Sequence, residues 1–346
     1  MNLETIKKYL KEYDGEEVAL MEVCGSHTGA ISKFGIPTLL SKKIRLISGP
    51  GCPVCVTPSA YIDRLIELCK EPDTCVATFG DLMRVPGSEK NLSLAKGEGG
   101  NVRMVYSPME LLTLAKENPT TNYIFAAVGF ETTTPVYALL LESLIRENIK
   151  NVKLLTALKT MPAAINWLCA SGAPITGFIA PGHVSVITGS DIFKPLADKY
   201  GIPFAVAGFQ GEEILEALYG LVKCQGSGKV MNFYPKVVTA EGNTVAQKKV
   251  ATYFEESSAV WRGMGAIEGS GLLLRKEYAE FDAGSADLNE DKKLNKACRC
   301  DQVLMGKISP TECPLFRKVC NPMNPQGACM VSEEGSCHQY LVNNRR

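Results

Sequence analysis

Eight short apolar runs, most of them separated by helix-length periodic segments, limit how this chain can fold more than any other feature. They cover residues 18–23, 44–48, 75–79, 102–106, 123–128, 152–158, 175–180 and 204–207. Strands that alternate with helices along a chain are typical of parallel, doubly wound sheets. With four runs in residues 1–118 and four in residues 119–276, the sequence predicts two similar α/β domains.

A different composition marks the C-terminal part of the chain, residues 277–346. A charged and polar linker is followed, from residue 298, by a stretch that is rich in Cys, Pro and Gly and has almost no periodicity. Loop-rich sequences with clustered cysteines are typical of metal-binding domains that lack a large core. We therefore expect a small, irregular third domain built around a metal centre.

The balance of charge and apolar residues excludes several classes of partner. The 37 basic residues equal the 37 acidic ones, so neither nucleic acid nor an anionic membrane is an expected partner. The first 17 residues predict a charged amphipathic helix rather than a signal peptide, and no apolar stretch approaches the roughly 20 residues that span a bilayer. In the cytoplasmic protein that we expect, 13 cysteines indicate metal or redox chemistry rather than structural disulfides.

The first two apolar runs each end in a turn that carries cysteine. Cys24-Gly-Ser-His27 follows the first run, and Gly-Pro-Gly-Cys52-Pro-Val-Cys55 follows the second. If the two strands are neighbours in a parallel sheet, three thiols and an imidazole meet at its carboxyl edge, where open α/β folds bind ligands. We therefore expect the active site at this edge.

Each of these residues also has a simpler interpretation. A single cysteine such as Cys24 is usually a small buried hydrophobe, and a Cys-x-x-Cys such as Cys52 to Cys55 divides between redox, metal-binding and incidental uses. Their combination favours a soft-metal or thiol-redox site. A helix that begins after each loop is expected to lower the pKa of these thiols.

Two further polar residues follow predicted strands. His183, in a Pro-Gly-His turn, is expected to face the cleft, although a structural histidine fits the pattern equally well. Glu131 precedes a helix start, where a carboxylate also favours the helix dipole without any catalytic role.

The spacing of the C-terminal cysteines distinguishes between two metal centres. Four thiolates can hold zinc or an iron–sulfur cluster, and zinc modules usually present paired Cys-x-x-Cys knuckles, which this segment lacks. Spacings of 12, 6 and 16 residues separate Cys300, Cys313, Cys320 and Cys337. The spacing favours a cluster over zinc and leaves Cys298 and Cys329 as additional thiols.

Several motifs, in this order along the chain, resemble the HypD family of hydrogenase maturation proteins. They are MEVCGSHT at 21–28, GPGCPVC at 49–55, GFETT at 129–133, PGHVS at 181–185, CPLF at 313–316 and MVS at 330–332 followed by Cys337. The resemblance covers essentially the whole chain. It implies two α/β domains and a third domain with a 4Fe-4S cluster, whose ligands fall on Cys300, Cys313, Cys320 and Cys337, with Cys298 and Cys329 outside the set.

The resemblance also implies a function. Members of the family are scaffolds on which the Fe(CN)2CO unit of NiFe hydrogenases is assembled, together with the small chaperone HypC and with cyanide supplied by HypE. For this chain it implies Cys24 as an iron anchor shared with HypC, and Cys52 and Cys55 as a reversible dithiol or second iron site. His27, Glu131 and His183 would move protons or support the iron site.

Two other functions stay open at this stage. One is a cluster-dependent thiol–disulfide oxidoreductase that acts on protein substrates through Cys52 and Cys55. The other is a binding scaffold without turnover of its own. We expect the protein to be monomeric alone.

Overall fold

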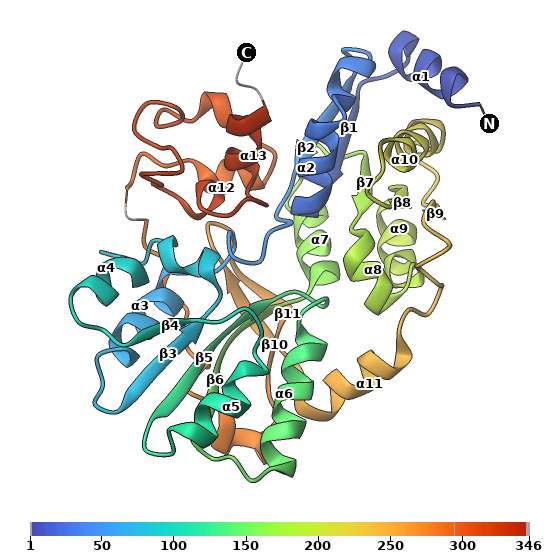
Figure 1. Cartoon of the computed structure of the whole chain (residues 1–346). Helices are drawn as coiled ribbons and strands as arrows, with labels where there is room; N and C mark the ends of the chain where they lie inside the picture. The colour runs from blue at the N-terminus through green and yellow to red at the C-terminus, as the bar shows by residue number, and fades with distance from the viewer. Residues whose placement is uncertain (1, 294, 344–346) are drawn as a thin grey trace.

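The computed structural model describes residues 2–293 and 295–343, which form two β-sheets surrounded by helices and a cysteine-rich C-terminal part (Figure 1). One sheet is parallel throughout and has the strand order β2-β1-β7-β8-β9. Its strands are β1 (Val18–Glu22), β2 (Ile44–Ser48), β7 (Gly177–Ala180), β8 (Phe204–Val206) and β9 (Val230–Asn232). We refer to it as the parallel sheet.

The second sheet, referred to as the mixed sheet, has the strand order β10-β11-β6-β5-β3-β4. Its strands are β3 (Thr74–Thr78), β4 (Val102–Met104), β5 (Asn122–Gly129), β6 (Val152–Lys159), β10 (Phe254–Trp261) and β11 (Gly265–Leu274). The first four are parallel, and β10 and β11 form an antiparallel edge. All eight predicted strands are present, which confirms the expected α/β fold class.

The two sheets do not follow the expected division at residue 118. That residue lies between β4 and β5, which belong to the same sheet, while β1 pairs with β7 from the second half of the chain. The chain crosses between the sheets after β2, after β6 and after β9. The expectation was wrong because an apolar run indicates that a strand is buried but does not indicate which strand it pairs with.

Helices cover the faces of both sheets. They are α1 (Leu3–Glu12), α2 (Gly25–Lys33), α3 (Ser59–Leu68), α4 (Leu92–Gly97), α5 (Glu110–Glu117), α6 (Thr134–Arg146), α7 (Met161–Ala170), α8 (Gly182–Thr188), α9 (Lys194–Tyr200), α10 (Gly211–Lys223) and α11 (Thr244–Tyr253). The last two helices, α12 (Cys300–Leu304) and α13 (Ser336–Asn343), belong to the C-terminal part. The predicted N-terminal helix is α1, which the side chain of Asn2 caps by accepting from the N–H of Glu4.

The C-terminal part contains little regular structure. Its helices α12 and α13 are short, and 3-10 turns such as η6 (Ala328–Met330) connect them. The segment expected to be a linker instead begins against the mixed sheet, where the N–H of Ala283 donates to the carbonyl of Leu154 at 2.9 Å. The cysteine-rich part therefore begins later than residue 277.

One large buried cluster joins the three parts. It contains Met21 and Phe178 from the parallel sheet, Leu155 from the mixed sheet, and Val303 and Cys313 from the C-terminal part. Burying one large apolar side chain contributes about 1.5–3 kcal/mol. The cysteine-rich part is thus packed on the sheets rather than tethered to them.

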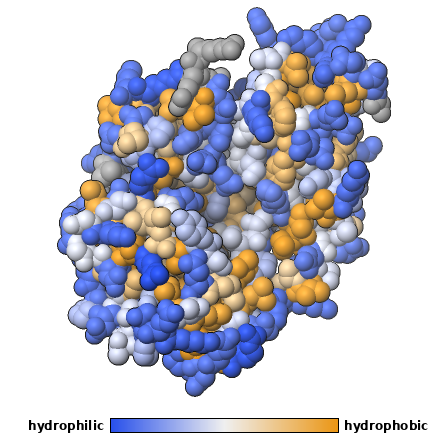
Figure 2. Space-filling view, viewed as in Figure 1, coloured by the Kyte–Doolittle hydropathy of each residue, from blue (hydrophilic) through white to orange (hydrophobic). Residues whose placement is uncertain are grey.

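Within residues 2–293 and 295–343, no helix is long and apolar enough to cross a membrane. Figure 2 shows hydrophobic residues scattered among hydrophilic ones on the face in view.

Candidate functional site

The two cysteine turns meet as the sequence predicts. Strands β1 and β2 are parallel neighbours, with Val18 opposite Ile44 and Glu22 opposite Ser48, so both turns leave the same sheet edge. Cys24 is the N-cap residue of α2. The expected convergence of the first and second cysteine motifs is therefore confirmed.

Gly51 allows the two turns to touch. A β-carbon at this position would clash with the backbone nitrogen and α-carbon of Cys24, and the N–H of Gly25 donates to the carbonyl of Gly51 at 3.1 Å. Only glycine fits so close to a neighbouring backbone. The glycine of the GPGC motif therefore sets the distance between Cys24 and the second motif.

Cys52 and Cys55 form a disulfide whose sulfurs are inside the protein. Their exposed fractions are 2% and 0%. The Cys55 Sγ lies 3.7 Å from the carbonyl oxygen of Ala328 in η6, and Ala328 directly precedes Cys329 of the C-terminal group. The disulfide therefore lies between the sheet edge and the C-terminal cysteines.

Cys24 is also buried, which the sequence did not predict. Its exposed fraction is 7%, and Glu334 from the C-terminal part packs against Gly25, the next residue. Burial raises the pKa of the Cys24 thiol to about 12, and hydrogen bonds from the N–H groups of His27 and Ser26 offset only part of this rise. The expected lowering of this pKa is wrong because loss of hydration outweighs the helix N-terminus.

Glu22 is a site residue that the sequence analysis missed. Its carboxylate accepts the N–H of Cys24 at 2.9 Å and the hydroxyl of Thr28, and burial raises its pKa to about 7. The sequence does contain a sign of its role, because Glu22 is the one carboxylate in an otherwise apolar strand. It also lines a pocket of about 420 Å³ between β2, α2 and the C-terminal part.

The two predicted histidines lie on either side of Phe209. The ring of His27 stacks on Phe209 at 4.7 Å and that of His183 at 4.2 Å between centroids. His183 is exposed, as predicted, whereas His27 is completely buried. The sequence could not show this burial because Phe209 comes from a distant loop.

His27 is held as a neutral imidazole. Its Nε2 lies 2.9 Å from the carbonyl oxygen of Gly208 and 3.2 Å from that of Ala207, so Nε2 carries the hydrogen and donates. Burial lowers its pKa to about 4. Its Nδ1 is buried and has no hydrogen-bond partner among the described residues.

Glu131 has different contacts from those of the cysteines. Its Oε1 accepts the N–H of Met161, the first residue of α7, at 2.8 Å, and burial raises its pKa to about 7. Its Oε2 is buried without a partner in the part of the chain that the structure describes. The carboxylate therefore caps α7 rather than the helix that follows it in sequence.

All six C-terminal cysteines are buried and lie in one group. The Sγ atoms of Cys329 and Cys337 are 3.2 Å apart, and Cys329 also makes a thiol hydrogen bond with Cys300. The charges that act most on Cys298 are those of Cys300, Cys313 and Cys320. Cys298 and Cys329, which the sequence analysis left outside the ligand set, are thus inside the group.

The surroundings of these sulfurs fit an iron–sulfur cluster. The N–H of Gln326 points to the Sγ of Cys320 at 3.4 Å, and a β-carbon on Gly327 would lie 2.8 Å from the Sγ of Cys298. Backbone N–H groups that point at thiolate sulfurs tune the reduction potential of an iron–sulfur cluster. Within the described ranges no three His, Cys, Asp or Glu side chains are arranged around a single metal ion. A 4Fe-4S cluster differs from a single ion because each thiolate binds a separate iron.

Known proteins resemble this chain over nearly its full length. The family model HypD, described as the hydrogenase formation hypA family, matches residues 2–344. A hydrogenase maturation factor HypD from Azotobacter vinelandii is 43% identical over 339 residues, which are 94% of this chain and 89% of the relative. HypD factors from Escherichia coli K12 (42% identical; 93% of this chain, 88% of the relative) and Cupriavidus necator (41% identical; 96% and 91%) match similarly. The chain therefore belongs to the HypD family.

Proposed function

We propose that the protein is a cytoplasmic maturation factor of NiFe hydrogenases, on which the Fe(CN)2CO unit is assembled together with a HypC chaperone and with cyanide from HypE. The supporting observation is the meeting of Cys24 with the Cys52–Cys55 disulfide at one sheet edge, directly against the C-terminal cysteines. The names of the relatives as hydrogenase maturation factors support the same role.

Cys24 is the residue that we propose to bind the iron of this substrate. Low-spin iron that carries cyanide and CO is a soft centre, for which a thiolate is a suitable ligand. The carboxylate of Glu22 fixes the backbone N–H of Cys24 and so orients the turn. Opening of the contact with Glu334 would be needed to admit iron and the chaperone, since Cys24 is buried.

The two histidines and Glu131 have distinct proposed tasks. His183 is exposed and can exchange protons with solvent, whereas the neutral His27 holds Phe209 against it. Glu131 positions the start of α7 by accepting the N–H of Met161. Of the three residues from which the sequence predicts proton transfer or support of the iron site, only His183 keeps a role in proton exchange.

We further propose that Cys300, Cys313, Cys320 and Cys337 hold a 4Fe-4S cluster, as the spacing of the sequence favours. The charges of Cys300 and Cys313 act on Cys320, and those of Cys300 and Cys320 act on Cys337, which supports this set. When bound, the cluster would supply electrons. The position of the Cys55 sulfur beside η6 supports an exchange of these electrons with the C-terminal group.

Infrared spectroscopy tests the main proposal. Protein purified without oxygen in complex with HypC should show absorption bands of bound cyanide and CO, which lie where protein does not absorb. A complex that contains iron but lacks these bands would contradict the proposal. Sedimentation should show a monomer in the absence of HypC.

The alternative function, thiol–disulfide oxidoreductase on protein substrates, has one observation in its favour, the Cys52–Cys55 disulfide. Both sulfurs are buried, and attack on a substrate disulfide requires an accessible thiolate. Reduction of a model protein disulfide by the reduced protein measures this activity directly. We expect none above the background of free thiol.

A further inference from the structure

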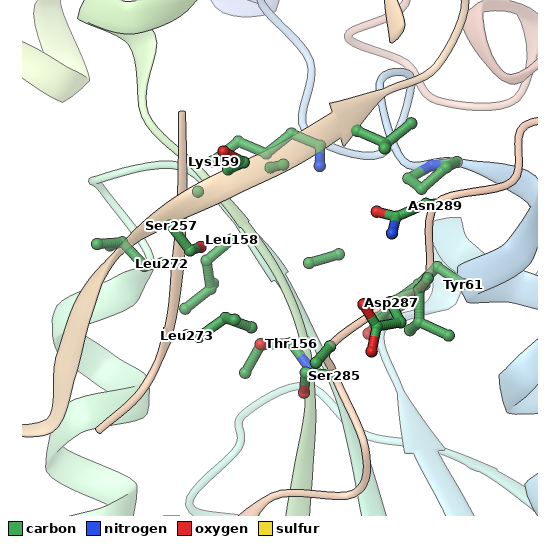
Figure 3. Close-up of a pocket in the computed structure, with 18 residues that line it drawn as sticks. Tyr61, Thr156, Leu158, Lys159, Ser257, Leu272, Leu273, Ser285, Asp287 and Asn289 are labelled. Carbon is green, nitrogen blue, oxygen red and sulfur yellow. The ribbon is translucent and has the colours of Figure 1, made fainter. Parts of the chain in front are cut away.

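A pocket of about 290 Å³, with no cysteine in its lining, lies in the mixed sheet (Figure 3). It opens where β11 pairs with β6 over only two residues, Gly271 with Lys159 and Leu272 with Leu158. The segment 285–289 closes one side, with the exposed residues Asp287 and Asn289 at its rim. This space is large enough for a small molecule.

Lys159, at the end of β6, is the charged residue inside this pocket. Its exposed fraction is 2%, and it takes part in none of the ion pairs between described residues; the carboxylate of Asp291 pairs with Arg262 instead, at 4.0 Å. Its Nζ lies 5.7 Å from the centroid of the Trp261 ring. A buried ammonium group without a paired anion is costly to keep in a fold.

Asp291 does not fill this role. The carboxylate of Asp291 acts on Lys159 only from a distance, because its oxygens accept the N–H groups of Ser59 at 3.2 Å and Gly263 at 2.8 Å. Burial lowers the pKa of Lys159 to about 7, and Asp291 offsets this only in part. A bound anion would compensate the amine where the protein does not.

A second polar group in the pocket also lacks a partner. The hydroxyl of Thr156 is buried and has no hydrogen-bond partner in residues 2–293 and 295–343. Figure 3 shows Lys159 at one end of the pocket, Thr156 with Ser285 at the other, and Leu158, Leu272 and Leu273 along the side. The pocket thus has one cationic end, an apolar wall and a hydroxyl.

We propose that this pocket binds a small monocarboxylate, with the carboxylate against the Nζ of Lys159 and the short apolar part against Leu158 and Leu272. One cation matches one negative charge. A phosphate would bring nearly two charges past Asp287 into a site with a single cation, and its excess charge would stay unpaired. The site goes beyond the proposed assembly function and requires neither iron nor a partner protein.

Calorimetric titration of the purified chain with sodium propionate tests the proposal. Propionamide, which has the same shape without charge, and inorganic phosphate serve as comparison ligands. Propionate should bind, and Lys159→Met should weaken its binding by at least about tenfold, since a charge-assisted contact is lost. Lys153→Met is the matched control, because Lys153 lies on the same strand but is exposed.

Thermal unfolding of the same variants separates binding from a structural role. Lys159→Met should raise the melting temperature without propionate, because an apolar side chain replaces an unpaired buried charge. A lower melting temperature would show that Lys159 already has a stabilising partner and would overturn the proposal. Equal binding of propionate by the wild-type and Lys159→Met proteins, or equal binding of propionamide or phosphate by the wild type, would overturn it as well.

A measurement without any variant completes the test. A crystal structure of the wild-type protein saturated with propionate should show the carboxylate within hydrogen-bond distance of the Nζ of Lys159. Density for propionate elsewhere only, or a water-filled pocket, would overturn the proposal.

Discussion

The two groups of cysteines in this protein are positioned by different means. Cys24, Cys52 and Cys55 follow parallel strands with a fixed register, so the sheet sets their places. The six C-terminal cysteines lie among short helices and turns, whose backbone hydrogen bonds are local and form no sheet register. We therefore expect the first group to keep its geometry without a cofactor, and the second to depend on the cluster that we propose it binds.

The largest expected effect follows from loss of the cluster. Cys320→Ala should remove the approximately four iron atoms of a 4Fe-4S centre and make the C-terminal part susceptible to proteolysis, while the two sheets stay folded. Iron and sulfide analysis with limited proteolysis measures both. Cys169→Ala, in α7 and outside either group, is the control.

Stoichiometric zinc without sulfide in the wild-type protein would contradict the cluster itself. The choice of ligands is tested by comparing Cys300→Ala, which should lose the cluster, with Cys298→Ala, which should keep it. The reverse result would put Cys298 in the ligand set in place of Cys300.

A cavity in the parallel sheet should destabilise the sheets but leave the cluster bound. Leu20→Ala, in the completely buried centre of β1, should lower the free energy of unfolding by about 2–5 kcal/mol through the cavity it leaves. Denaturant unfolding of the sheets measures this loss. Below the transition the cluster should remain at full occupancy; its loss from the folded variant would show that the two regions are not independent.

The buried carboxylates should make the sheets sensitive to pH. The pKa of Glu131 is about 7 in the fold against 4.5 as its ordinary value, so the folded protein retains a proton that the unfolded chain loses. The free energy of unfolding should therefore fall as pH rises from about 4.5 to 7, by up to about 3 kcal/mol for this group, and be constant for it above and below that range.

Glu131→Gln should flatten this pH dependence when unfolding is followed by urea titration at each pH. Glu22, whose pKa is also about 7, contributes equally to the pH dependence of the free energy of unfolding in both proteins. The exposed Glu268 on β11 provides the control variant Glu268→Gln. An unchanged slope in Glu131→Gln would show that this carboxylate is not buried as described.

The smallest effect concerns the contact between the two regions. The hydroxyls of Ser48 in β2 and Ser336 in α13 are 2.8 Å apart. Ser48→Ala should lower the local stability of α13 by about 1 kcal/mol, measured by hydrogen exchange. Exchange in the centre of the sheets should not change. Faster exchange throughout the protein would show that this bond supports the whole fold rather than the contact.

The local parts of the fold could be predicted from the sequence. Strands β1 and β2 are short apolar runs bounded by turn residues, and their neighbouring position followed from the parallel pattern. The pairing of β1 with β7 could not be predicted, because Leu20 and Gly177 are far apart in sequence and neither carries a signal for the other. The expected division into consecutive domains failed for this reason.

The same limit applies to the candidate site. The sequence identified Cys24 and His27 as residues at a sheet edge, but it did not show that Glu334 and Phe209 cover them. Burial is decided by these distant residues, and it reverses the expected pKa of Cys24.

The most direct test of the account measures both cysteine groups in one sample. Cys24→Ala protein, purified without oxygen in complex with HypC, should lack the infrared bands of cyanide and CO but keep the iron, sulfide and visible absorption of the cluster. The side chain is small and lies at a turn, so its removal should leave the fold intact. Full cyanide and CO bands in this variant would contradict the central claim, and the iron anchor would then have to be Cys52 or Cys55.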